Sequence, residues 1–230
     1  MSQETRANRY TVLSSNSPVE SLLEIKRSEF IGFVQRVETE EGARAFIESI
    51  RKTYHDARHV CSAFVLGADR DVQRSSDDGE PAGTAGIPML QALLARRTHG
   101  RQGEETTDLS DVVAVVVRYF GGIKLGAGGL VRAYTDAVVQ VLDESHLVPR
   151  ERLRLGAITS SHAEAGRLEN DLRSLGYTVL GAEYQPDHAV LTVGVFDDEA
   201  SKEAAEEKIA SLTAGANTIN WGQSEWVDLV

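Results

Sequence analysis

The sequence predicts an α+β protein with two domains, residues 1–148 and 149–230. One observation is the apolar run Val112–Val117, which is followed by a glycine-rich stretch and then by apolar residues at helical spacing. The other is the pattern after Arg150, which gives strands and helices in the order β-α-β-β-α-β. That order is typical of a ferredoxin-like domain. Pro149 and Arg150 mark the expected boundary between the domains.

The elements of the first domain follow from changes in the hydrophobic period along the chain. Two short alternating runs predict a hairpin, and the spacing of Phe46 and Ile50 predicts a helix with one apolar face. Pro88 is well suited to the first turn of a later helix. In chain order we expect strands at 22–26 and 30–37, a helix at 39–54, a strand at 60–66, a turn with a short strand at 69–72, a polar loop at 74–86, a helix at 88–97, a flexible connection at 98–110, a strand at 112–117 and a helix at 130–142.

The second domain carries clear start and stop signals for its helices. Ser161 and Glu164 predict a capping box, and Gly176 is placed to end the same helix. Asp197 and Asp198 predict the start of the second helix, which continues to about residue 212. The remaining alternating runs predict strands at 153–159, 177–184, 189–195 and 218–227.

Composition and charge limit the possible classes of function. The chain has 230 residues, an apolar content of 41% and a net charge of −11, which argues against a general coat for nucleic acid. From Glu151 onward there are 6 basic and 14 acidic residues, so the first domain is the one able to contact a polyanion. No apolar run could span a membrane, and the N-terminus has no signal-peptide core. The single cysteine, Cys61, lies in an apolar run and is expected to be a buried thiol. We therefore expect a cytoplasmic protein with no membrane contact.

The glycine-rich stretch after the central strand is the first candidate site. A helix that begins after such a loop presents unpaired N–H groups and a partial positive charge, which favour an anion. No acidic residue occurs between Val112 and Tyr134, whereas Arg118, Lys124 and Arg132 do. The known phosphate-loop patterns do not fit, and the alternative is that the glycines serve close packing between strand and helix. The glycines are Gly121, Gly122, Gly126, Gly128 and Gly129.

The polar loop before Pro88 is the second candidate site. Its carboxylates and hydroxyls are hard oxygen ligands of the kind that bind Mg²⁺ or a polar substrate. The alternative is a solvated loop whose acids cap the next helix. A histidine, His59, precedes the apolar run that leads toward this loop, but the sequence gives it no convincing metal-ligand partners. The candidate residues are His59, Ser76, Asp77, Asp78, Glu80 and Thr84. The sequence assigns no catalytic residue, cofactor or metal site.

Three ordered motifs give the chain a resemblance to a known family. They are Arg58-His59-Val60-Cys61, SDDGEPAGTAGIPML at 76–90 and VVVRYFGGIKLGAGGLVRAYTDA at 115–137. These motifs resemble the YigZ/IMPACT family in its bacterial two-domain form. The resemblance implies an N-terminal domain similar to domain IV of elongation factor G and to GHMP kinases, and a ferredoxin-like C-terminal domain. It also implies a role near translation, although the kinase inhibition by eukaryotic members depends on an RWD domain for which there is no room before Leu22.

Two hypotheses of function remain open, with a pure protein-partner adaptor as a third. In the first, Arg58, Arg118, Lys124 and Arg132 hold RNA phosphates together with the glycine loop, and Tyr119 or Phe120 stacks on a base. Ribosomes or translation factors are the related partners. In the second, the protein is an enzyme acting on a phosphorylated small molecule, with the glycine loop 121–129 on the phosphate and the acidic loop 75–80 supplying a base or metal ligands. The enzyme gains support if the acidic loop faces the glycine loop, and loses it if the acids cap backbone N–H groups.

Overall fold

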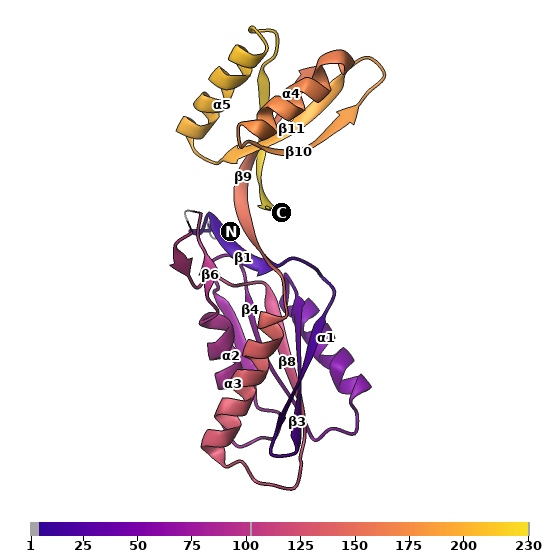
Figure 1. The fold of residues 1–230 in the computed structure, drawn as a ribbon, viewed down its shortest axis with the longest axis vertical. Coiled ribbons are helices and arrows are strands. Elements are labelled where there is room, and N and C mark those ends of the chain that lie inside the picture. The colour runs from indigo at the N-terminus through magenta and orange to yellow at the C-terminus, as the bar shows by residue number, and fades with distance from the viewer. Residues whose placement is uncertain (1–4, 102, 230) are drawn as a thin grey trace. The chain divides into compact units, whose positions relative to one another are not determined.

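The structure is a computed structural model that describes residues 5–101 and 103–229 of the chain (Figure 1). Its helices and largely antiparallel sheets confirm the α+β class. The described chain divides into two compact units: the first extends to Arg150 and includes Asp228, and the second comprises Glu151–Val227. Strand β9 (Leu147–Ser160) runs without interruption from the first into the second. Within the described residues, no helix combines the length and apolar character needed to cross a membrane.

The first unit is built on a five-stranded antiparallel sheet whose strand order is β2-β3-β8-β4-β5. Strand β8 is central, with β3 on one side and β4 on the other. The strands are β2 (Val19–Ile25), β3 (Ser28–Arg36), β4 (His59–Leu66), β5 (Val72–Ser76) and β8 (Val112–Tyr119).

Helices cover both faces of this sheet (Figure 1). Helix α1 (Glu40–Thr53) packs on the face that carries Val113 and Val115, and helices α2 (Gly86–Leu94) and α3 (Ala127–Asp143) pack on the opposite face. Because successive side chains of a strand point to opposite faces, β8 needs apolar residues at every position. All six residues from Val112 to Val117 are fully buried, which confirms the predicted two-faced burial.

The second unit has the predicted order of elements. Its sheet has the order β12-β9-β11-β10, and the pairs β9–β11 and β10–β11 are antiparallel. Its core contains Ile158, Leu172 and Leu191. The elements after β9 are α4 (His162–Ser174), β10 (Thr178–Tyr184), β11 (Ala189–Phe196), α5 (Glu199–Leu212) and β12 (Ile219–Asp228). In the first unit, strand β1 (Arg9–Leu13) neighbours β9, and β6 (Thr98–His99) pairs with β7 (Glu105–Thr106).

Several element boundaries differ from the predictions for identifiable reasons. Residues 74–76 belong to β5, because this edge strand pairs in register with β4 although its side chains are polar. The connection at 98–110 includes the β6–β7 pair. Helix α3 begins at Ala127, before the first apolar residue of its periodic pattern. The capping box at Ser161 does not form, since its hydroxyl bonds to the Glu164 carboxylate at 2.9 Å and caps no backbone N–H.

Candidate functional site: a cationic cavity at one end of the first unit

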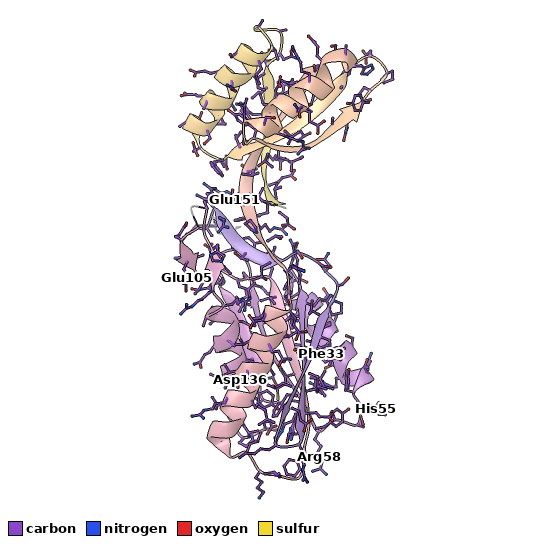
Figure 2. All side chains as sticks on the ribbon, viewed as in Figure 1. Phe33, His55, Arg58, Glu105, Asp136 and Glu151 are labelled. Atoms are coloured by element: carbon purple, nitrogen blue, oxygen red, sulfur yellow. The ribbon has the colours of Figure 1, made fainter. Side chains whose placement is uncertain are left out.

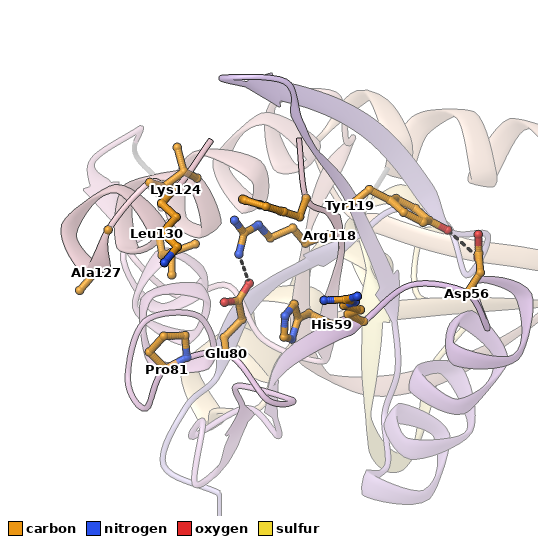
Figure 3. A pocket seen from close by; sticks show the side chains of 13 residues that line it. Asp56, His59, Glu80, Pro81, Arg118, Tyr119, Lys124, Ala127 and Leu130 are labelled. Carbon is orange, nitrogen blue, oxygen red and sulfur yellow. Dashed lines mark hydrogen bonds and ion pairs between the residues drawn. The ribbon is translucent and has the colours of Figure 1, made fainter. Parts of the chain in front are cut away.

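A cavity of about 590 Å³ opens where β4 begins and β8 ends (Figure 3). Its walls come from the residues before β4, the polar loop, the end of β8 and the first turn of α3. Figure 2 shows one lining residue, Arg58, at the end of the unit far from Glu105. The lining residues are Asp56, Arg58, His59, Glu80, Pro81, Arg118, Tyr119, Phe120, Lys124, Leu125, Gly126, Ala127 and Leu130. The polar loop and the glycine loop therefore face one another across a single cavity.

A buried ion pair lies in the cavity wall. The Nη1 of Arg118 donates to Oε1 of Glu80 at 2.6 Å, and both side chains are at least nine-tenths buried. The hydroxyl of Tyr134, from α3, donates to the same carboxylate oxygen at 2.8 Å. The register of β4 with β8 sets His59 opposite Arg118 and so fixes the position of Arg118 beside the polar loop that carries Glu80. Arg118 is thus held in place from the sheet, the polar loop and α3 together.

Two aromatic rings also fix the Arg118 guanidinium. Its centre lies 5.4 Å from the centroid of the buried Phe30 ring and 5.7 Å from that of Phe120. Contacts at this range are favourable for a cation over an aromatic face. Phe120 itself is 55% exposed, so part of its ring remains available to a ligand.

The thiol of Cys61 lies behind this pair. Its Sγ is 3.4 Å from the Tyr134 hydroxyl and 2.9 Å from the carbonyl oxygen of Asp77. Burial raises the pKa of Cys61 to about 12, and burial likewise raises the pKa of Tyr134. Since the thiolate is the reactive form of cysteine, Cys61 serves here as a packed core residue, as the sequence predicts.

The cavity also holds cations that have no carboxylate partner. Arg58 and Lys124 line it, are exposed, and form no ion pair with any described residue. The adjacent start of α3 is uncapped: Gly126, at φ 72°, supplies no side chain, and the first turn contains no acidic residue. The free N–H groups and partial charge of such a helix start favour an anion.

Two acidic residues occur among the described cavity-lining residues, and both are already engaged. Glu80 is paired with Arg118. Asp56 accepts a hydrogen bond from the Tyr119 hydroxyl at 2.8 Å. Burial and this bond raise the pKa of Tyr119 to about 12, and the same bond lowers the pKa of Asp56. Tyr119 therefore remains a neutral phenol whose ring is held toward Asp56 (Figure 3).

The other acids of the polar loop bind backbone groups. The Asp77 carboxylate accepts from the N–H groups of Gly83, Ala85 and Gly86 at 2.8–3.0 Å. Burial raises the pKa of Asp77, but these three bonds outweigh it, and the net pKa is lowered. Asp77 thus organises the loop at the start of α2 instead of facing the cavity.

Asp78 is engaged in a similar way. One carboxylate oxygen accepts from the Val60 N–H at 2.8 Å, and the other pairs with Arg51 at 3.2 Å. Its carbonyl oxygen lies 3.0 Å from Nδ1 of His59. Within residues 5–101 and 103–229, no three His, Cys, Asp or Glu side chains are grouped so that they could hold a metal ion.

The predicted site residues divide into two groups. Those that line the cavity are Arg58, His59, Glu80, Arg118, Tyr119, Lys124 and Gly126. Those that do not are Ser76, Asp77, Asp78, Thr84, Gly121, Gly122, Gly128, Gly129 and Arg132. Ser76 lies in β5, and the Thr84 hydroxyl donates to the Pro81 carbonyl at 2.7 Å.

The glycines themselves have more than one role. A Cβ on Gly121 would lie 2.0 Å from the backbone of Arg27, so this glycine permits close packing against the β2–β3 turn. Gly128 and Gly129 belong to the first turn of α3 and not to the loop. The packing alternative therefore explains Gly121, whereas Gly126 forms the uncapped helix start at the cavity.

The sequence prediction missed several cavity-lining residues. Asp56, Pro81 and Ala127 gave no signal of their own in the sequence, and Leu125 and Leu130 were indistinguishable from core residues. Their common feature is proximity in sequence to a predicted site residue. Pro81, Leu125, Ala127 and Leu130 already lie inside the quoted motifs, and extending the first motif by two residues would have included Asp56.

Comparisons with known proteins add independent information. The family described as the Impact N-terminal domain matches residues 26–142, and a domain of unknown function (DUF1949) matches residues 158–216. The chain is 38% identical to the IMPACT family member YvyE of Bacillus subtilis over 89% of this chain and 88% of that protein. It is 39% identical to the IMPACT family member YigZ of Escherichia coli over 74% and 78% of the two chains. A crystal structure described as that of a hypothetical protein is 34% identical, covers 92% of this chain and 96% of its own, and superposes with a TM-score of 0.56.

Proposed function

This chain belongs to the IMPACT family, and on that premise we propose that it is a cytoplasmic protein that binds RNA, or RNA within the translation machinery, and thereby regulates translation. The observation that carries the proposal is the cavity. It is lined by the buried, positioned Arg118, by Arg58 and Lys124, which have no ion-pair partner among the described residues, and by an uncapped helix start. Phosphate contacts of this kind position a nucleic acid on a protein.

The charge distribution supports a polyanion at this place despite the net charge of −11. Among the described cavity-lining residues, Glu80 is neutralised by Arg118, and the one remaining negative charge, on Asp56, is outnumbered by Arg58 and Lys124. The β2–β3 turn, which packs against Gly121, adds the exposed Lys26 and Arg27, and neither forms an ion pair with a described residue.

The exposed ring of Phe120 favours single-stranded RNA over double-stranded RNA as the ligand. One part of Phe120 faces Arg118 and the rest is open to solvent. Stacking on an exposed ring is how single-stranded nucleic acid is commonly held, because every base offers a flat face.

The carboxylates that a metal-dependent enzyme would need as ligands already have other partners. The carboxylate of Asp77 binds backbone N–H groups, and that of Asp78 binds a backbone N–H group and Arg51. Glu80 is paired with Arg118. Although the two loops face one another, the acids of the polar loop thus have other partners than a phosphate-bound metal.

We also propose the finer fold assignments. The order β-α-β-β-α-β with strands arranged β12-β9-β11-β10 supports a ferredoxin-like second unit. For the first unit, a sheet with helices on both faces and the family membership support the fold shared with domain IV of elongation factor G and GHMP kinases.

The test is a titration of labelled single-stranded RNA at several salt concentrations. Lys124→Ala should weaken binding and lower the slope of log affinity against log salt by about 1, because one phosphate contact is lost. Lys52→Ala is the matched control, since it removes the same charge from the exposed end of α1 outside the cavity. Equal effects of the two variants would contradict a cavity-centred phosphate contact, and no binding at low salt would refute the RNA proposal.

A further inference from the structure

We propose that the cavity cleaves the RNA that it binds, with His59 as the general base in a transesterification that uses only side chains. This inference rests on the proposed function, and it adds a reaction to the same site. It starts from a feature that phosphate binding alone does not require: a histidine whose ring orientation and proton position are both fixed.

The contact with Asp78 fixes the proton on His59. Nδ1 lies 3.0 Å from the Asp78 carbonyl oxygen, and because a carbonyl oxygen only accepts, Nδ1 must carry the hydrogen. In the neutral ring, Nε2 then keeps its lone pair. No described residue bonds to Nε2, and His59 lines the cavity (Figure 3).

The group that fixes His59 is itself rigid. Asp78 has a left-handed backbone (φ 43°) and is held by its bonds to the Val60 N–H and to Arg51. Gly79 follows at φ 84°, and a Cβ there would lie 3.6 Å from Nδ1 of His59, so the ring packs over this glycine. A base supported in this way keeps its lone pair in one direction, as the orienting partner of a catalytic histidine does in other enzymes.

Three cations line the cavity that would hold the phosphate. Nη1 of Arg118 is used by Glu80, whereas its buried Nε has no hydrogen-bond partner among the described residues. Lys124 and Arg58 line the same cavity without carboxylate partners. Fixed positive charge is most effective in catalysis where negative charge increases in the transition state, as it does on a phosphate under attack.

The proposed reaction balances without a further reactant. Nε2 of His59 takes the proton of a ribose 2′-OH, and the 2′ oxygen attacks the adjacent phosphorus. The O2′–P bond forms and the P–O5′ bond breaks, while the Lys124 ammonium gives a proton to the leaving 5′ oxygen. The products are a 2′,3′-cyclic phosphate and a 5′-hydroxyl, and His59 and Lys124 return to their starting states by exchanging protons with water.

The experiment uses the full chain with a short single-stranded RNA labelled at its 5′ end, in the presence of EDTA. We expect products that end in 2′,3′-cyclic phosphate. A matched DNA strand with one ribonucleotide should be cut only at that position, because only there is a 2′-OH available. His59→Gln should cleave at least roughly 100-fold more slowly, as expected for removal of a general base, while its affinity for RNA changes little.

His55→Gln is the matched control, because it removes a nearby histidine that does not line the cavity, and it should cleave like the wild type. Equal rates for wild type and His59→Gln would assign any cleavage to a contaminant and overturn the inference. RNA binding without cleavage would overturn it too, and would leave the proposed function standing. If RNA does not bind at all, the proposed function and the cleavage both fail. The binding titration therefore separates failure of the proposed function from failure of the cleavage alone.

Discussion

Two helix starts, each following one of the two loops that line the cavity, are built in opposite ways. The polar loop returns to the start of α2 so that Asp77 accepts three backbone N–H bonds there. The glycine loop leads into α3 without any side-chain cap and without an acidic residue in the first turn. A free helix start attracts negative charge, and the chain supplies an anion at the start of α2 but none in the first turn of α3. The contrast separates an acidic loop whose Asp77 binds backbone N–H groups from a glycine loop that leaves its helix start without a cap, although both looked functional in the sequence.

Removing the Asp77 carboxylate from the start of α2 should have the largest effect on stability. Asp77→Ala leaves three backbone N–H groups without their partner, and we expect a loss of about 2–4 kcal/mol in the free energy of unfolding. Urea denaturation measures it. Asp198→Ala, which removes one cap bond at α5, is the matched control and should cost about 1 kcal/mol. Equal losses would mean that Asp77 is an ordinary cap.

The same contribution should depend on pH with a defined sign. The folded pKa of Asp77 is lowered relative to its ordinary value. Its contribution is therefore present above the unfolded pKa of about 4 and is lost as the pH falls through the lower folded pKa. The difference in stability between wild type and Asp77→Ala should accordingly shrink in acid and stay constant from neutral to mildly alkaline pH.

Packing at the glycine loop should give the next largest effect. Gly121→Ala places a Cβ 2.0 Å from the backbone of Arg27, and we expect a destabilisation of about 1–3 kcal/mol. Gly128→Ala is the control within the same motif: its Cβ meets nothing within 4 Å, and alanine favours the helix by about 0.5–1 kcal/mol. Thermal unfolding of both variants checks this, and a neutral Gly121→Ala would contradict the close packing of the loop against the β2–β3 turn.

The smallest change in stability should come from giving α3 the anion that α2 already has. Ala127→Glu puts a carboxylate into the first turn of α3, which should stabilise the fold by about 0.3–1 kcal/mol. The same carboxylate lies in the cavity lining and should weaken RNA binding by tenfold or more through repulsion. Ala127→Gln, which is similar in size but uncharged, should leave binding near the wild-type level. Equal affinities of the two variants for RNA would contradict the proposal that the start of α3 binds an external anion.

The sequence was informative where a local pattern decides the structure. The unbroken run of six apolar residues predicted the central strand, because a strand buried on both faces needs an apolar side chain at every position. The helical spacing of apolar residues from Leu130 onward predicted α3, because that helix buries one face. For the same reason the order of elements in the second unit was predictable.

Pairings between distant segments left no such trace. Arg118 and Glu80 are 38 residues apart, and the register of β4 with β8 brings them together. The role of Asp77 depends on the path by which the loop returns six to nine residues later. The sequence therefore predicted two candidate site loops. It could not predict which acids bind backbone N–H groups, which one pairs with Arg118 and which ones line the cavity.

The position of Cys61 gives the molecule a built-in reporter. It is the only cysteine in the chain, its side chain is fully buried, and burial raises its pKa to about 12. A thiol reagent can therefore reach it only in those molecules in which the packing around it, which includes Asp77 and Tyr134, has opened. The rate of alkylation of one native atom thus measures how often the wall of the cavity opens, and a ligand that bridges the two loops should slow it.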